Sequence, residues 1–114
     1  MSYKNRADQR KYAKKHYWEN KATYKERDRL HDKLHRELAR RLISTLKDVP
    51  CADCGVKYPS YVMDFDHLNP KLKAKDVSTM IDYSLDKIVA EAEKCQVVCS
   101  NCHRRRTWNR CRVE

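Results

Sequence analysis

The apolar residues of the first half of the chain follow a helical spacing. Leucines recur every four residues, which places them along one face of a helix. The members of this stripe are Leu30, Leu34, Leu38 and Leu42, continued by Ile43 and Leu46. No Gly or Pro interrupts the chain between Ser2 and Val49. The pattern predicts helix over roughly residues 3–47, in one or two pieces.

After Pro50 the pattern changes to short apolar segments separated by turn residues. Residues 61–67 and 96–98 have the composition and alternation of short strands. Ser84 is expected to cap a helix that ends at about residue 94, and another helix is expected from Ser100. The segment between the first strand and this capped helix is expected to be loop.

These elements predict an α+β fold in two parts. Residues 1–49 form a long basic helical arm, and residues 50–114 form a small domain. The arm carries 15 Lys and Arg against 7 Asp and Glu, so it holds most of the net charge of +10. Three uses of the arm stay open: docking of its leucine face on the domain, pairing with a second copy as a homodimer, or contact with a phosphate backbone.

The basic surface limits the classes of partner. A net charge of +10 attracts polyanions, so DNA is the expected partner, with an anionic membrane surface or simple solvation as the alternatives. No apolar run approaches the roughly 18 residues that cross a bilayer, and the first residues lack the apolar stretch of a signal peptide. We therefore expect a cytoplasmic protein without a membrane partner, whose cysteines are reduced.

Four of the six cysteines form two CxxC pairs. Cys51 and Cys54 make the first pair, and Cys99 and Cys102 make the second after 44 intervening residues. Two such pairs complete a tetrahedral four-thiolate zinc site, whereas one pair alone would equally suit thiol redox chemistry. Four thiolates leave no open position, so this Zn²⁺ is expected to be structural. Its binding would contribute about 10–16 kcal/mol to folding.

Asp66, His67 and His103 are the candidate catalytic residues. Asp66 and His67 end the first strand, and His103 directly follows the last cysteine of the second pair. One ion held by both pairs would bring these three residues together. A carboxylate and an imidazole then make an open site for a divalent ion, beside which a second imidazole can act as a base. The alternative for each residue is a solvated polar side chain.

At this point the sequence resembles the HNH endonuclease family, also described as ββα-metal or His-Me finger nucleases. The resemblance covers about residues 51–107, or half of the chain. It is carried by Cys51-x-x-Cys54, by Phe65-Asp66-His67 followed by Pro70, and by Val97-Val98-Cys99-Ser100-Asn101-Cys102-His103-Arg104. It implies a β-hairpin and a helix around a catalytic metal, with the four-cysteine zinc at the base of the domain.

The resemblance also implies the roles of the site residues. His67 would be the general base, and Asp66 and His103 would bind one catalytic divalent ion: Mg²⁺ or Mn²⁺, with Zn²⁺ or Ni²⁺ as alternatives. The activity expected is hydrolysis of DNA phosphodiester bonds, by nicking or by cutting both strands, with low sequence specificity. The competing interpretation is a catalytically silent zinc-ribbon module that only binds nucleic acid.

One position departs from the family pattern. Lys94 occupies the place of the Asn that usually braces the loop bearing the base. Asn69, Asn101 or a backbone group is expected to substitute, and Asn69 is favoured because it lies in the loop just after His67.

A run of arginines follows His103. Arg104, Arg105 and Arg106 are suited to phosphate contacts, because each guanidinium is a bidentate donor. A solvated helix face is the alternative for this run. Trp108, two residues further on, is expected to be a packing residue.

Overall fold

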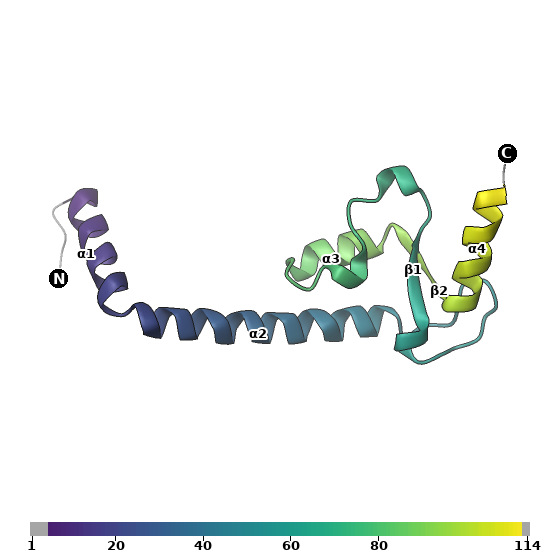
Figure 1. The fold of residues 1–114 in the computed structure, drawn as a ribbon, viewed down its shortest axis with the longest axis horizontal. Helices are drawn as coiled ribbons and strands as arrows, with labels where there is room; N and C mark the ends of the chain where they lie inside the picture. Colours follow the sequence, from purple (N-terminus) through teal and green to yellow (C-terminus); the bar gives the residue numbers. More distant parts are fainter. Residues whose placement is uncertain (1–4, 113–114) are drawn as a thin grey trace. The chain divides into compact units, whose positions relative to one another are not determined.

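A computed structural model describes residues 5–112 and contains four helices, three short 3₁₀ helices and one small sheet (Figure 1). These residues form two compact units, the first ending at Leu34 and the second beginning at His35. The division lies inside a helix and differs from the boundary near Pro50 expected from the sequence. Its physical cause is burial, since Ala39 and Ile43 of that helix belong to the core of the second unit.

The arm is helical, as the sequence predicted, and of the one or two pieces expected the structure has two. Helix α1 spans Arg6–Glu19 and helix α2 spans Lys21–Leu46. The side chain of Asn5 caps α1 by accepting a hydrogen bond from the backbone N–H of Asp8 at 3.0 Å, and Asn20 separates the two helices. The predicted residues 3 and 4 lie outside the described part of the chain. Within residues 5–112, none of the helices combines the length and apolar character needed to cross a membrane.

The leucine stripe is buried only at its C-terminal end. Leu30, Leu34 and Leu38 are exposed by 55%, 61% and 52%, whereas Leu42 and Leu46 pack against the core of the second unit. Within the second unit, Leu42, Ile43 and Leu46 are therefore the part of the stripe that contributes to the core.

The core of the second unit joins α2 to helix α3, which spans Leu85–Ala92. The buried side chains are Ala39, Ile43, Val77, Met80 and Ile88. As expected, Ser84 caps α3, accepting a hydrogen bond from the N–H of Lys87. The segment expected to be loop contains two 3₁₀ helices, η2 (Pro70–Leu72) and η3 (Val77–Thr79). The second of these turns forms because Val77 and Met80, three residues apart, enter the core together.

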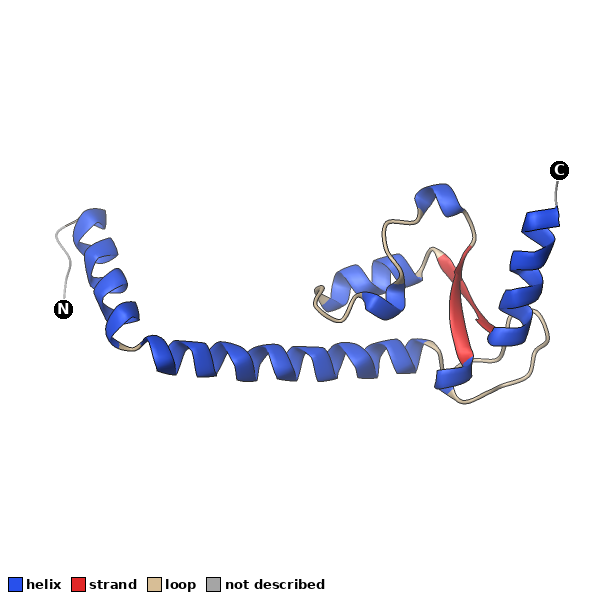
Figure 2. Cartoon of the chain, in the orientation of Figure 1, coloured by secondary structure: helices blue, strands red, loops and turns tan. Residues whose placement is uncertain are grey.

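The sheet has two antiparallel strands, β1 (Met63–His67) and β2 (Cys95–Cys99), drawn in red in Figure 2. Their register pairs Met63 with Cys99 and His67 with Cys95. A third 3₁₀ helix, η1 (Ser60–Val62), precedes β1, and helix α4 (Ser100–Arg112) follows β2 directly. Because side chains alternate along a strand, Asp64 and Asp66 share one face of β1 and His67 lies on the other. The face with the aspartates is the one that α4 contacts.

Candidate functional site

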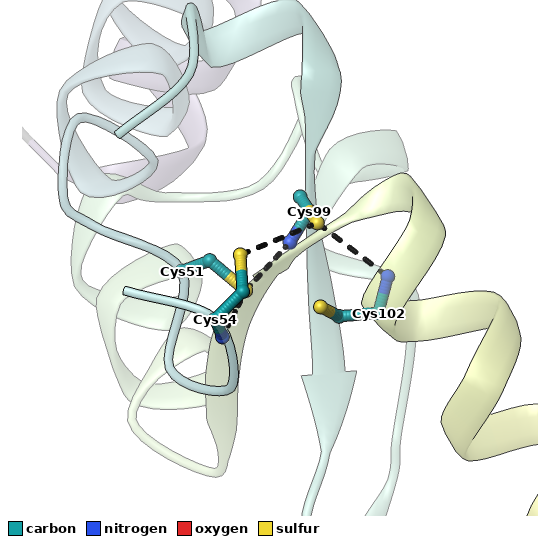
Figure 3. A group of neighbouring side chains, drawn as sticks. All are labelled: Cys51, Cys54, Cys99 and Cys102. Atoms are coloured by element: carbon teal, nitrogen blue, oxygen red, sulfur yellow. Dashed lines mark hydrogen bonds between the residues drawn. The ribbon is translucent and has the colours of Figure 1, made fainter. Parts of the chain in front are cut away.

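The four cysteines of the CxxC pairs come together at one end of the sheet (Figure 3). Cys51 and Cys54 lie in a turn completed by Gly55, which has a φ of 74° that glycine adopts without strain. Cys99 ends β2, and Cys102 lies in the first turn of α4. Their four Sγ atoms lie within 4.8 Å of one another. Zn–S bonds of about 2.3 Å in a tetrahedron separate the sulfurs by about 3.8 Å, so the cluster could hold a structural zinc ion, as predicted.

The four cysteine thiols are so close together that the charge on one thiolate affects the ionisation of the others. Burial would raise the pKa of Cys51, but backbone N–H donation from Cys54 and Cys99 lowers that pKa to about 6. The pKa of Cys102, in contrast, rises to about 12 because its thiol donates to Cys99 and is desolvated. Ionisation of some thiols therefore opposes ionisation of the others, and a bound cation is what allows all four to be thiolates. Within residues 5–112, this is the one group of three or more potential metal ligands that lie so close together.

A second set of polar side chains lies between β1 and α4. The Oδ1 atom of Asp66 lies 3.6 Å from Nε2 of His103, and Oδ2 of Asp64 lies 3.1 Å from Nδ1 of the same ring. With the Nδ1 proton donated to Asp64, the Nε2 lone pair of His103 faces the Asp66 oxygen. A carboxylate bonded to the far nitrogen of an imidazole orients it as a metal ligand. The structure thus brings together Asp66 and His103, and adds Asp64, which the sequence interpretation missed.

Two arginines of α4 also hold Asp66. Arg106 donates from Nη1 to Oδ2 at 2.8 Å, and Arg110 donates to both oxygens at 2.8 Å. Burial of Asp66 would raise its pKa, but hydrogen bonds from Arg110 and Arg106 keep that pKa below the usual range. Arg106 also bonds to Asp53 in the first cysteine turn and to Gln96 on β2. Arg106 therefore links the cysteine cluster to Asp66, whereas the sequence suggested a phosphate contact.

His67 lies on the opposite face of β1 and has a different partner. Its ring is 7% exposed, and its Nε2 atom lies 2.9 Å from Oε1 of Glu91 on α3. With Nε2 donating its proton to this carboxylate, Nδ1 is the ring nitrogen that can accept a proton. His67 is thus held by Glu91 and not by Asp66 or His103.

Glu91 is itself firmly fixed. Its side chain accepts hydrogen bonds from Lys94 Nζ at 2.8 Å and from the backbone N–H groups of Ala74 at 3.0 Å and Lys75 at 3.4 Å. The hydrogen bond from Lys94 is the largest cause that lowers the pKa of Glu91 to about 2. The sequence interpretation missed Glu91, although one signal was present: an acidic residue three positions after Ile88, on the buried face of α3.

Among the hydrogen bonds of the described residues, none joins His67 to either of the two asparagines considered for the bracing role. Asn69 caps η2 by accepting a hydrogen bond from the N–H of Lys71 at 3.0 Å, so it braces the loop that follows the histidine. Asn101 lies exposed in the first turn of α4. The side chain bonded to His67 is Glu91, one turn before the Lys94 that departs from the family pattern.

The remaining arginines of the run lie at the surface. Arg104 and Arg105 are exposed, and together with Asn101 and Trp108 they line a shallow groove on α4. Trp108 is 63% exposed, so the expectation that it packs is wrong. Its position three to four residues after the two arginines puts it on their side of the helix, away from the core.

Comparison of the chain with protein-family models, with curated proteins and with solved structures yields no match in any of the three. The assignment of a function therefore rests on the geometry of the site and on the motifs of the chain itself.

Proposed function

We propose that the chain is a metal-dependent endonuclease of the HNH type, which hydrolyses DNA phosphodiester bonds with low sequence specificity. The strands β1 and β2 with α4 would then be its ββα-metal unit. One observation carries the proposal: Asp66 Oδ1 and His103 Nε2 face each other across 3.6 Å, with the other ring nitrogen bonded to Asp64. Two acceptor atoms in this arrangement suit a shared cation.

The pair fits a divalent ion in distance and in chemistry. Ligand atoms lie about 2.0–2.2 Å from such ions, which separates two neighbouring ligands by about 3.0–3.6 Å. Carboxylate oxygen and imidazole nitrogen suit Mn²⁺, Zn²⁺ or Ni²⁺, and carboxylate oxygen with water suits Mg²⁺. A divalent ion held by Asp66 and His103 would supply a Lewis acid beside the phosphate oxygens. Asp64 orients His103 for that role, and Arg106 fixes the carboxylate of Asp66.

His67 supplies the base in this proposal. With Nε2 donating to Glu91, Nδ1 would be the nitrogen that takes a proton from the attacking water. Because the His67 ring lies on the face of β1 opposite Asp66, this role requires the water to be reached from beyond the end of that strand. The buried carboxylate also stabilises the imidazolium that results, as a carboxylate does for the base of a catalytic triad. The water oxygen would bond to phosphorus as the bond from phosphorus to the leaving oxygen breaks. The leaving oxygen would depart with the bonding electron pair and take a proton from solvent water.

DNA as the substrate is supported by charge. The chain has a net charge of +10, and Arg104 and Arg105 are exposed on the helix that carries His103. Electrostatic attraction to phosphates gives affinity without reading sequence, which agrees with low specificity.

The test is relaxation of a supercoiled plasmid by the zinc-loaded protein, with and without Mg²⁺ or Mn²⁺. We expect metal-dependent nicking or linearisation that Asp66→Ala, His67→Ala and His103→Ala each abolish. The matched control is His31→Ala, because the side chain of His31 is 82% exposed and lies in the arm. Cleavage that needs no divalent metal, or that survives His67→Ala, would contradict the proposal.

The second candidate is a silent zinc-ribbon module that binds nucleic acid. It is favoured by the two arginines on Asp66, because they already neutralise its charge without any metal. A preparation that binds DNA tightly, but leaves it intact with every divalent metal, would select this alternative.

A further inference from the structure

Among residues 5–112, the one hydrogen-bond partner of the Arg110 side chain is Asp66. Its Nη1 donates to Asp66 Oδ1 and its Nη2 to Asp66 Oδ2, both at 2.8 Å. The side chain of Arg110 is 45% exposed, while that of Asp66 is 4% exposed. The bond thus joins a partly exposed guanidinium to a carboxylate that is almost fully buried.

Arg106 approaches the same carboxylate in a different way. It bonds to Asp53, Asp66 and Gln96 at once, and its side chain is 19% exposed. It also uses only the Oδ2 atom of Asp66. Arg106 can therefore stay in place when the other oxygen of Asp66 gains a new partner.

Arg110, in contrast, cannot keep its hydrogen bond to Asp66 when a metal ion binds Oδ1. The oxygen that its Nη1 contacts is Oδ1, the same atom that faces His103 Nε2 at 3.6 Å. A divalent ion on Oδ1 would lie next to the guanidinium of Arg110, because both would contact the same oxygen. Two neighbouring cations repel each other strongly in a partly buried site. The exposed Arg110 side chain can leave into water at small cost, because its charge is solvated there.

We propose that Arg110 is a phosphate-binding residue that divalent metal releases from Asp66. This inference rests on the proposed nuclease function. Without metal, the guanidinium serves as the counter-cation of Asp66. With metal, it turns to a phosphate of the nucleic acid at the same site, since guanidinium binds phosphate and carboxylate in the same bidentate geometry. The affinity for DNA thereby becomes coupled to metal binding.

The first measurement is the affinity of the zinc-loaded protein for Mn²⁺, followed by electron paramagnetic resonance. Arg110→Gln is expected to bind Mn²⁺ about fivefold to tenfold more tightly than wild type, because one partly exposed charge-assisted pair need not be broken. The matched control is Arg112→Gln, an exposed arginine on the same helix that removes the same charge. Arg112→Gln is expected to bind Mn²⁺ like wild type.

The second measurement is binding of a short DNA duplex in a His67→Ala background, in which the proposed base is absent. Without added divalent metal, Arg110→Gln and Arg112→Gln are expected to bind DNA equally well. With Mn²⁺, Arg110→Gln alone is expected to weaken binding and to reduce the slope of log affinity against log salt by about one, the effect of one lost phosphate contact.

The outcomes separate the two proposals. If Asp66→Asn leaves Mn²⁺ affinity unchanged, no divalent site includes Asp66, and both the nuclease function and the role of Arg110 are overturned. If Asp66→Asn weakens Mn²⁺ binding but Arg110→Gln does not strengthen it, the role of Arg110 alone is overturned. The same conclusion follows if Arg110→Gln and Arg112→Gln lower DNA affinity equally in Mn²⁺.

Discussion

Replacement of Glu91 by Gln tests the buried contact that holds His67. The side chain of Glu91 is 5% exposed and accepts four hydrogen bonds, from His67, Lys94 and the N–H groups of Ala74 and Lys75. In Glu91→Gln the amide oxygen can still accept from His67 and the backbone, but the amide NH₂ faces the Lys94 ammonium. The variant thus keeps the shape of the contact and loses its charge.

The size of the effect follows from these contacts. Breaking a fully buried pair costs about 3–5 kcal/mol, but Lys94 is 38% exposed and can turn to water. We therefore expect a loss of about 1–3 kcal/mol, the range for a charged hydrogen-bonded group left without its partner. This is a large share of the roughly 5–15 kcal/mol by which a domain is stable.

The assay is urea unfolding of the zinc-loaded protein at neutral pH, with Glu93→Gln as the matched control. Glu93 is exposed at the end of the same helix and carries the same charge. Equal unfolding free energies for Glu91→Gln and Glu93→Gln would refute the reasoning.

The pH dependence of the unfolding free energy gives a second check. Because folding lowers the pKa of Glu91 from 4.5 to about 2, its contribution is complete above pH 4.5 and is lost as pH falls toward 2. The difference between wild type and Glu91→Gln should shrink in that window.

Three further predictions address the zinc site, the DNA contacts and the arm. Cys51→Ser should unfold the second unit, because structural zinc contributes about 10–16 kcal/mol; a wild-type melting curve by circular dichroism would contradict the zinc site. Arg104→Gln and Arg105→Gln should each reduce the salt dependence of DNA binding by about one counterion, measured by fluorescence anisotropy, and an unchanged slope would exclude that arginine from the interface. If the arm pairs two copies through its leucines, Leu34→Glu should convert a dimer to a monomer in sedimentation, whereas a wild-type monomer would exclude this pairing.

The sequence predicted the features that depend on near neighbours. The helices of the arm, the Ser84 cap and the strand before His67 follow from spacing over a few residues, and all are present. The cysteine cluster was also predictable, although its halves lie far apart in the chain, because thiols in two CxxC pairs have one common chemistry. The local sequence pattern was therefore sufficient to predict these helices and this strand, and the ligand chemistry of cysteine was sufficient to predict the cluster.

Contacts between distant residues were not predictable in the same way. Glu91 meets His67 across 24 positions, and Arg110 meets Asp66 across 44. Nothing in the spacing of either residue points to its partner, because the contact depends on how α3 and α4 pack on the sheet. The leucine stripe shows the same limit: periodicity identified the face of α2 but not that Leu34 and Leu38 are left exposed.

The two motif histidines share an arrangement that distinguishes them from the other three in the chain. Each has one ring nitrogen bonded to a carboxylate from another element, His103 to Asp64 and His67 to Glu91. A module that only bound DNA would have no need to fix the tautomer of either ring. In the proposed site, β1 would supply the metal ligand Asp66 and the orienting carboxylate Asp64 from one face, and His67 from the other. We therefore expect Asp64→Ala to weaken Mn²⁺ binding without changing the zinc content, and equal Mn²⁺ affinities would remove the main support for a catalytic metal.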